Sequence, residues 1–157
     1  LDLPAALWPL AQLARQAALS TRRMTPAEHR IEIELEVPFH DVDALHVVWH
    51  GHYYKYFELA RTALFRARRL DVPDMIELGY RMVVIESKCR HTFPLRYGDR
   101  FRVSAWFKEV EYRFNIAFEI ENLTAERRAA KGHTIMATLD PAGNLLLATP
   151  QCMTARL

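Results

Sequence analysis

The stretch FHDVDALHVVWHGHYYKYFELAR, residues 39–61, decides the fold of this chain because two different sequence periods meet in it. Just before it, residues 30–37 (RIEIELEV) alternate charged and apolar side chains, as a half-buried β-strand does. From about residue 51 to residue 70, apolar side chains recur at helical spacing on two neighbouring stripes. A helix that is apolar over so much of its circumference is expected to be enclosed by the rest of the protein.

The sequence after this helix predicts strands joined by short turns. We expect a short helix at 73–78 and then strands at 81–93, 101–108, 113–122, 129–139 and 145–149. The segment DPAGN at 140–144 has the turn residues of a hairpin between the last two strands. One helix cannot cover six strands from outside and also be apolar nearly all round. The residues therefore favour an α+β architecture, the hotdog fold, in which a curled antiparallel sheet wraps around one long central helix.

The composition of the chain limits its class and its partners. With 157 residues, of which 50% are hydrophobic and 25% charged, the chain is long enough for a core of its own. Its 21 basic and 19 acidic residues leave a net charge of +2, which gives no reason to expect nucleic acid as a partner. No apolar run is long enough to span a membrane. Cys89 and Cys152 lie far apart and form no CxxC motif, which favours a reducing, cytoplasmic location.

Residues 1–24 are predicted to form an extra amphipathic N-terminal helix and a linker, apart from a main domain at 25–157. Leu3, Leu7 and Leu10 recur near helical spacing, and Pro4 suits a first helical turn. We expect this helix to pack on the domain or on a second subunit. Contact with a membrane surface is the weaker alternative, because the polar face lacks Lys and Arg enrichment. No basic region precedes the apolar stretch, so a secretory signal is not expected.

The loop between the first strand and the long helix is crowded with ionisable residues: His40, Asp41, Asp43, His46, His50 and His52. His46 and His50 have the i, i+4 spacing of two metal ligands on one helix face. However, two valines between them and Gly51 after them argue against a helix there, and no HExxH motif is present. The chain also lacks a GxSxG motif and a glycine-rich phosphate loop. We therefore predict no metal and no cofactor site.

What remains in this loop is a carboxylate beside a helix N-terminus, an arrangement that suits acyl transfer. Backbone N–H groups of the first helical turn can hold a carbonyl oxygen as it becomes an oxyanion. A carboxylate close by can attack the carbonyl or deprotonate water. Asp41 and Asp43 share the same parity along the chain, so alternation does not choose between them. Either one could instead cap the turn.

Several spaced motifs resemble those of a known family. The segments DVDA at 41–44 and VVWH at 47–50, then Tyr53 and FELAR at 57–61, resemble the signature of hotdog-fold acyl-CoA thioesterases. These are the 4-hydroxybenzoyl-CoA thioesterase family and its Tol-Pal-associated acyl-CoA thioesterase relatives. Tyr53 follows Asp43 by ten residues, as in that signature, and PLRYGD at 94–99 resembles the family's P-x-x-Y-G-D turn. The resemblance extends from about residue 32 to residue 149.

This resemblance implies a hydrolase that cleaves an acyl-CoA or acyl-carrier-protein thioester and needs no cofactor, since CoA is part of the substrate. It assigns Asp43 as the nucleophile or general base and the N–H of His50 as the oxyanion donor, with both residues catalytic. Trp49, Gly51 and Tyr53 would bind the substrate. The family further implies a homodimer or homotetramer with the acyl site between two subunits. Glu58 and Arg61 are expected to form a structural ion pair within or between subunits.

The chain departs from the family pattern at one position. Relatives usually have glycine after D-x-D-x, where this chain has Leu45-His46. Glycine permits a positive φ or a close approach of the ligand, so Leu45 is expected to change the turn or to fill part of the pocket. The alternative function is therefore a non-catalytic hotdog protein that binds acyl thioesters. A hotdog dehydratase is not expected, because the segment HTFP at 91–94 only partly matches the motif of those enzymes.

Overall fold

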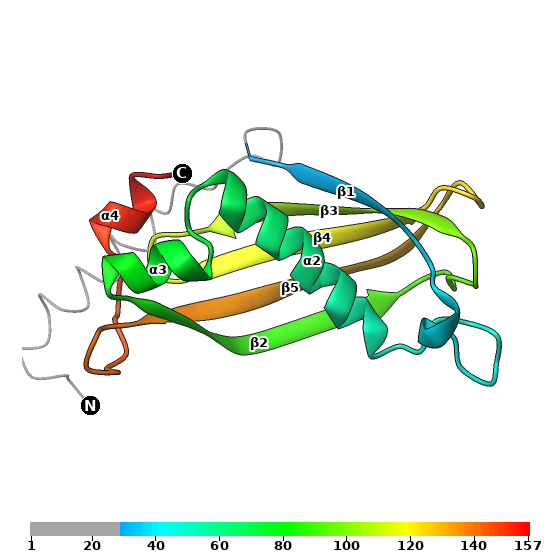
Figure 1. Ribbon diagram of the computed structural model, residues 1–157, viewed down its shortest axis with the longest axis horizontal. Helices are drawn as coiled ribbons and strands as arrows, with labels where there is room; N and C mark the ends of the chain where they lie inside the picture. The colour runs from blue at the N-terminus through cyan, green and yellow to red at the C-terminus, as the bar shows by residue number, and fades with distance from the viewer. Residues whose placement is uncertain (1–28) are drawn as a thin grey trace, which may run out of the picture.

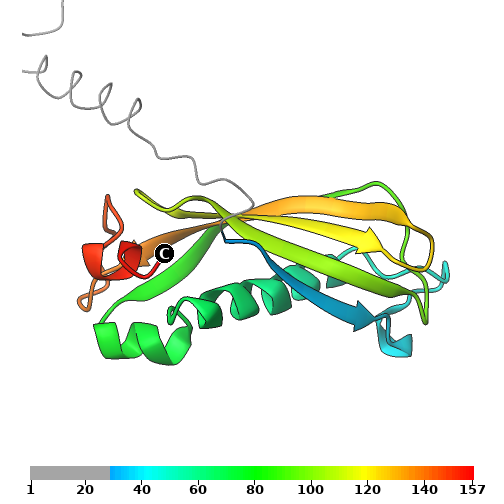
Figure 2. The ribbon, with the colours of Figure 1, turned by 90° about the horizontal axis from the view of Figure 1, so that it is seen from above.

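The computed structural model describes residues 29–157, so the predicted N-terminal helix and the division of the chain at residue 24 lie outside the described residues. Five antiparallel strands form one sheet, and a long helix lies along one face of it (Figures 1 and 2). The strands are β1 (Ile31–Glu36), β2 (Arg81–His91), β3 (Arg100–Glu109), β4 (Phe114–Asn122) and β5 (Arg127–Leu139). The helices are the 3₁₀ turn η2 (Phe39–Asp41), α2 (His52–Ala67), α3 (Val72–Leu78) and α4 (Gln151–Thr154).

The strand order in the sheet is β1-β3-β4-β5-β2, and each strand is antiparallel to its neighbours. Strands β1 and β2 therefore form the two edges of the sheet. The sheet curls over α2, which runs lengthwise along its inner face (Figure 2). This arrangement confirms the predicted hotdog architecture, although the sheet is open and does not close around the helix.

The core forms where the apolar stripe of α2 meets the sheet. Tyr53, Phe57, Ala60 and Leu64 are buried, as the helical spacing predicts. Phe57 stacks on Phe118 of β4, with ring centroids 4.6 Å apart and an interplanar angle of 11°. Burial of such a side chain contributes about 2–3 kcal/mol.

The outer side of α2 is less covered than its sequence predicts. Tyr54 and Leu59 are 39% and 47% exposed. The expectation that the helix is enclosed on all sides is therefore wrong for a single chain. The physical reason is that the open sheet covers only one side of the helix.

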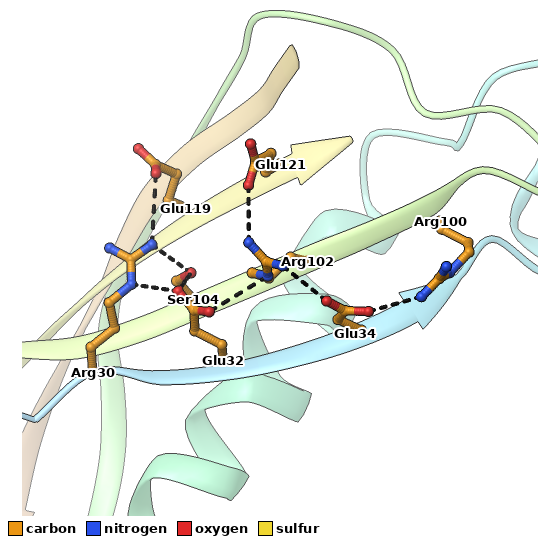
Figure 3. Close-up of polar contacts among 8 residues, drawn as sticks. All are labelled: Arg30, Glu32, Glu34, Arg100, Arg102, Ser104, Glu119 and Glu121. Atoms are coloured by element: carbon orange, nitrogen blue, oxygen red, sulfur yellow. Dashed lines mark hydrogen bonds and ion pairs between the residues drawn. The ribbon is translucent and has the colours of Figure 1, made fainter. Parts of the chain in front are cut away.

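The outer face of the sheet carries the acidic side of β1. Antiparallel pairing places Glu34 beside Arg102 of β3, and their side chains form an ion pair of 3.0 Å. Glu32 pairs with Arg30 at 2.8 Å and with Arg102 at 3.5 Å (Figure 3). The alternating pattern of residues 30–37 thus forms the half-buried strand it predicts, with its acids turned away from the helix.

The predicted sixth strand at 145–149 is wrong. The turn at 140–144 forms as expected, with the Asp140 N–H donating to the Asn144 carbonyl at 2.9 Å. Only an isolated bridge between Leu139 and Leu145 follows it. The chain then leaves the sheet: the Thr149 N–H bonds to the Glu111 carbonyl, and Pro150 caps the start of α4. Proline has no N–H for a strand ladder, so the chain cannot continue as a strand past Thr149.

The turn at 94–99 leads from β2 into β3 and is hydrogen-bonded to Val37, the residue that follows β1. Gly98 has a φ of 76°, which glycine adopts without strain. The Asp99 carboxylate accepts hydrogen bonds from the Arg96 N–H at 2.9 Å and from the Asn122 side chain at 2.8 Å. The Val37 N–H donates to the Asp99 carbonyl at 3.0 Å. The Tyr-Gly-Asp motif is therefore structural.

Candidate active site

An open pocket of about 370 Å³ lies where the loop before α2 meets the end of β2. Its walls come from both segments and from the chain after β2: Asp43, Leu45, Val47, Val48, His50, Tyr53, His91, Thr92, Phe93 and Pro94. Three of the predicted site residues, Asp43, His50 and Tyr53, thus meet in one pocket. Trp49 and Gly51 do not line it.

Asp43 lies in a tight turn that fixes its side chain. Its N–H donates to the Val47 carbonyl at 2.9 Å, and its own carbonyl accepts from the His46 N–H at 3.0 Å. Its Oδ1 accepts a hydrogen bond from the Leu45 N–H at 2.8 Å. One oxygen of the carboxylate therefore stabilises the turn. The capping role considered from the sequence is real, and it also holds the carboxylate at the pocket wall.

Asp41 has different surroundings. It is buried, and its carboxylate accepts hydrogen bonds from the Lys55 ammonium and, at 2.6 Å, from the Tyr56 hydroxyl. Burial opposes ionisation of this carboxyl, but the Lys55 and Tyr56 hydrogen bonds and the Lys55 charge outweigh it and lower the pKa of Asp41. Asp41 thus ties the loop to α2. The two acids that the sequence could not separate are distinguished by their contacts.

Helix α2 begins at His52 with Gly51 as its N-cap, close to the predicted start at residues 50–51. The His52 N–H donates to the Trp49 carbonyl at 2.9 Å, and the Tyr53 N–H to the His50 carbonyl at 3.4 Å. The N–H groups of His50 and Gly51 donate in none of the turn and cap hydrogen bonds of residues 29–157. Such groups lie at the positive end of the helix dipole and are available to an anionic ligand atom.

Trp49 and Gly51 shape the start of the helix from outside the pocket. A Cβ atom at Gly51 would lie 2.2–2.7 Å from ring carbons of Trp49, so only glycine leaves room for the indole. The indole is half-exposed and packs edge-on against the His52 ring, with centroids 5.3 Å apart. The predicted substrate-binding role of these two residues remains a prediction.

Tyr53 lines the pocket from the first turn of α2. It is buried, and its hydroxyl accepts a hydrogen bond from the Leu95 N–H at 3.3 Å. Burial raises the pKa of Tyr53, so the side chain is neutral at physiological pH. The Leu95 carbonyl in turn accepts from the Val48 N–H at 2.8 Å. The segment after β2 is thereby attached to the loop that carries Asp43.

His91 is a pocket residue that sequence reasoning missed. It ends β2 and packs edge-on against Tyr53, with ring centroids 4.5 Å apart. Burial and the nearby His50 ring lower the pKa of His91, against the effect of a hydrogen bond with the His50 backbone. The imidazole is therefore neutral at pH 7. The only signal in the sequence was the HTFP segment, which gave no indication that β2 ends opposite the Asp43 loop.

The unusual backbone in the turn belongs to His46, not to Leu45. His46 has a φ of 58°, in the left-handed region that favours glycine, whereas Leu45 is not among the positive-φ residues. Leu45 is 79% exposed and lies at the rim of the pocket. Leu45 thus contributes to the pocket wall, and its effect on the turn remains a prediction. His46 adopts the left-handed conformation that a glycine would allow.

Within residues 29–157, no three potential ligands converge on a metal position.

Glu58 and Arg61 form the predicted ion pair within one chain, three residues apart on α2. Both line a second cavity, of about 250 Å³, between α2 and α3. The Arg61 side chain is only 15% exposed. The pair thus belongs to the packing of α2 rather than to the Asp43 pocket.

Comparisons with known proteins agree with this fold. The model of the thioesterase-like superfamily matches residues 37–157. An Aquifex aeolicus protein, provisionally named an esterase, is 31% identical over 98 residues, which are 62% of this chain and 76% of that protein. Bacillus subtilis YneP, provisionally named an acyl-CoA thioesterase, is 28% identical over 81 residues, 52% of this chain and 59% of YneP. A 4-hydroxybenzoyl CoA thioesterase mutant complexed with 4-hydroxybenzoyl CoA shares the fold at 15% identity, with a TM-score of 0.72 over 82% of this chain and 98% of its own.

Among residues 29–157, no helix combines the length and the apolar character needed to cross a membrane.

Proposed function

The chain belongs to the thioesterase-like superfamily, and from this premise we propose that it hydrolyses an acyl-CoA or acyl-carrier-protein thioester. The observation that carries the proposal is the shared pocket of Asp43 and His50 at the start of α2. A carboxylate and a helix-start residue with a free N–H group in one pocket are the two elements that thioester hydrolysis needs. The relative YneP, named for this activity, supports the substrate class.

In this mechanism the thioester carbonyl oxygen accepts a hydrogen bond from the N–H of His50. Asp43 then acts in one of two ways. As nucleophile, it attacks the carbonyl carbon and expels the thiolate, and water hydrolyses the resulting anhydride. As general base, it takes a proton from water, which attacks the carbonyl itself. Both routes yield a carboxylic acid and a free thiol. The His50 ring assists by holding the water or by protonating the leaving thiolate.

The geometry of the turn favours catalysis over a binding-only function. The binding-only alternative rested on the missing glycine at residues 45–46. His46 supplies the left-handed backbone at that point, with a φ of 58°. In this turn the Leu45 N–H donates the hydrogen bond that orients the Asp43 carboxylate.

The functional unit is proposed to be a homodimer or homotetramer. β2 is a sheet edge, and its residues Val83, Val84 and Ile85 are 39%, 49% and 58% exposed. A free edge with an apolar surface is suited to pairing with a second copy of the same strand. Such pairing would place the partner subunit beside the pocket.

The free thiols of Cys89 and Cys152 support the proposed cytoplasmic location.

A panel of aromatic and aliphatic acyl-CoA and acyl-carrier-protein thioesters, followed by detection of the released thiol, tests the function. Asp43→Asn is expected to lower kcat at least about 100-fold. Its melting temperature should stay unchanged, because the asparagine Oδ1 still accepts from the Leu45 N–H. Asp140→Asn, in a distant turn, is the matched control. Full activity of Asp43→Asn would refute the mechanism, and thioester binding without turnover by the wild type would establish the binding-only alternative.

A further inference from the structure

The sheet face turned away from α2 carries two different arrangements of charge. Along β1, β3 and β4, acidic and basic side chains neutralise one another in one network (Figure 3). Its members are Arg30, Glu32, Glu34, Arg100, Arg102, Glu119 and Glu121. This half of the face has no surplus of positive charge.

Across β2, β5, β4 and β3, the same face is hollowed and cationic. A hollow of about 480 Å³ is lined by Lys88 and Arg90 of β2, Lys108 of β3 and Lys131 of β5. None of these four side chains forms an ion pair with any of residues 29–157. We call this site the cationic hollow. The acid at its wall, Glu119, already pairs with Arg30 at 3.9 Å and with Arg128 at 3.6 Å.

The net charge of the chain is only +2. The overall charge therefore does not explain why four cations without ion-pair partners gather in this hollow. Their mutual repulsion is unfavourable and is relieved when an anion binds between them. Trp106 also lines the hollow, and the Arg30 guanidinium lies over its ring, 5.2 Å from the centroid. An indole ring offers a flat surface on which a nucleotide base can stack. Phosphate groups joined to an aromatic base thus match both features, and the volume is in the range of small-molecule sites.

The cationic hollow and the Asp43 pocket lie on opposite faces of the same edge strand. His91 lines the pocket, while Arg90, the preceding residue, lines the hollow. Successive side chains of a strand point to opposite faces, and residues 88 to 91 span only about 10 Å. A ligand that passes around this end of β2 can therefore occupy both sites. CoA has the required form: its thioester is separated by a long, flexible pantetheine arm from a 3′-phosphorylated ADP.

We propose that the cationic hollow binds the 3′-phosphorylated ADP of CoA while the thioester lies at Asp43. The proposal rests on the proposed thioesterase function and names CoA, rather than a carrier protein, as the carrier of the acyl group. A carrier protein presents phosphopantetheine without a nucleotide and would leave the Trp106 surface without a base. Lys88, Arg90, Lys108 and Lys131 are then contacts to the CoA phosphates.

Calorimetric titration with adenosine 3′,5′-bisphosphate tests the hollow without any hydrolysis. The wild type should bind this probe, with an affinity that falls as salt is added. Lys108→Ala and Lys131→Ala should each weaken binding about five- to tenfold. Arg100→Ala is the matched control, because Arg100 lies on the same face but pairs with Glu34. Failure of the wild type to bind the probe, or equal weakening by Arg100→Ala, would overturn the proposal.

Kinetics on two esters of the same acyl group separate the nucleotide contact from catalysis. The N-acetylcysteamine thioester lacks the nucleotide. In Lys131→Ala, the ratio of the KM for the acyl-CoA to the KM for this thioester should therefore rise about tenfold above the wild-type ratio. An equal change in both KM values refutes a nucleotide site. A rise confined to acyl-carrier-protein thioesters would assign the hollow to a carrier protein and also refute it. If the wild type cleaves no thioester but binds the bisphosphate in the hollow, the proposed function fails while the nucleotide site stands.

Discussion

The Tyr56 hydroxyl donates a hydrogen bond of 2.6 Å to the buried carboxylate of Asp41, and this contact joins the loop before α2 to the helix itself. Lys55 of the same helix donates to that carboxylate at 2.5 Å. Asp43, two residues further along, lies in the pocket wall instead. The D-x-D motif thus contains one acid that is buried against the helix and one that lines the pocket.

Asp41→Ala should lower the free energy of unfolding by about 3 kcal/mol, because it leaves the buried Tyr56 hydroxyl without its acceptor and Lys55 without its partner. Urea denaturation followed by circular dichroism measures this loss. Asp43→Ala is the matched control, since it removes only the Leu45 hydrogen bond and should cost about 1 kcal/mol. Equal losses for the two variants would show that Asp41 has no special structural role.

The contribution of Asp41 to stability should disappear in acid. Its pKa is lowered in the folded protein, so the folded state favours the ionised carboxylate. The stabilisation is complete above the unfolded-state pKa of about 3.9 and is lost as the pH falls through the lower folded-state value. The gap in unfolding free energy between the wild type and Asp41→Asn should therefore be widest near pH 7 and should narrow below pH 4. A difference in unfolding free energy that stays constant down to pH 2.5 would contradict the lowered pKa of Asp41.

The turn before α2 should become more stable when His46 is replaced by glycine. His46 holds a φ of 58°, and a left-handed conformation costs a residue with a Cβ about 1 kcal/mol. His46→Gly should therefore raise the free energy of unfolding by up to about 1 kcal/mol. The adjacent Leu45→Gly should instead lower it by about 0.5–1 kcal/mol, because Leu45 needs no positive φ and glycine gains entropy in the unfolded chain. Thermal melts of both variants, compared with wild type, decide whether the two changes have opposite signs.

Sequence periodicity was sufficient for most of the fold. The alternation of charged and apolar residues at 30–37 predicts β1. The buried face of α2 follows from the helical spacing of Tyr53, Phe57, Ala60 and Leu64. The apolar run at 145–149 has the local pattern of a strand but forms none. Its local pattern could not reveal that Thr149 bonds to Glu111 and that Pro150 turns the chain into α4.

The candidate site was only partly predictable, because it depends on contacts between distant segments. The family signature brought Asp43, His50 and Tyr53 to attention, and all three line one pocket. His91 lies 48 residues from Asp43 in the sequence, and only the position of β2 at the sheet edge brings it there. Asp41 and Asp43 share parity, so the different burial of the two acids follows from where Lys55 and Tyr56 lie in the folded chain.

The exposed apolar segment of β2 is the expected contact between the subunits of the proposed oligomer. Val84→Asp places a charge on the free edge, where Val84 is 49% exposed, and should prevent a second copy from pairing along it. We expect light scattering after size exclusion to show a shift to monomer, with a loss of thioester hydrolysis because the partner wall of the pocket is absent. Leu147→Asp, at a position 87% exposed outside the sheet, should change neither property. A Val84→Asp protein that retains the wild-type mass would show that the subunits meet elsewhere.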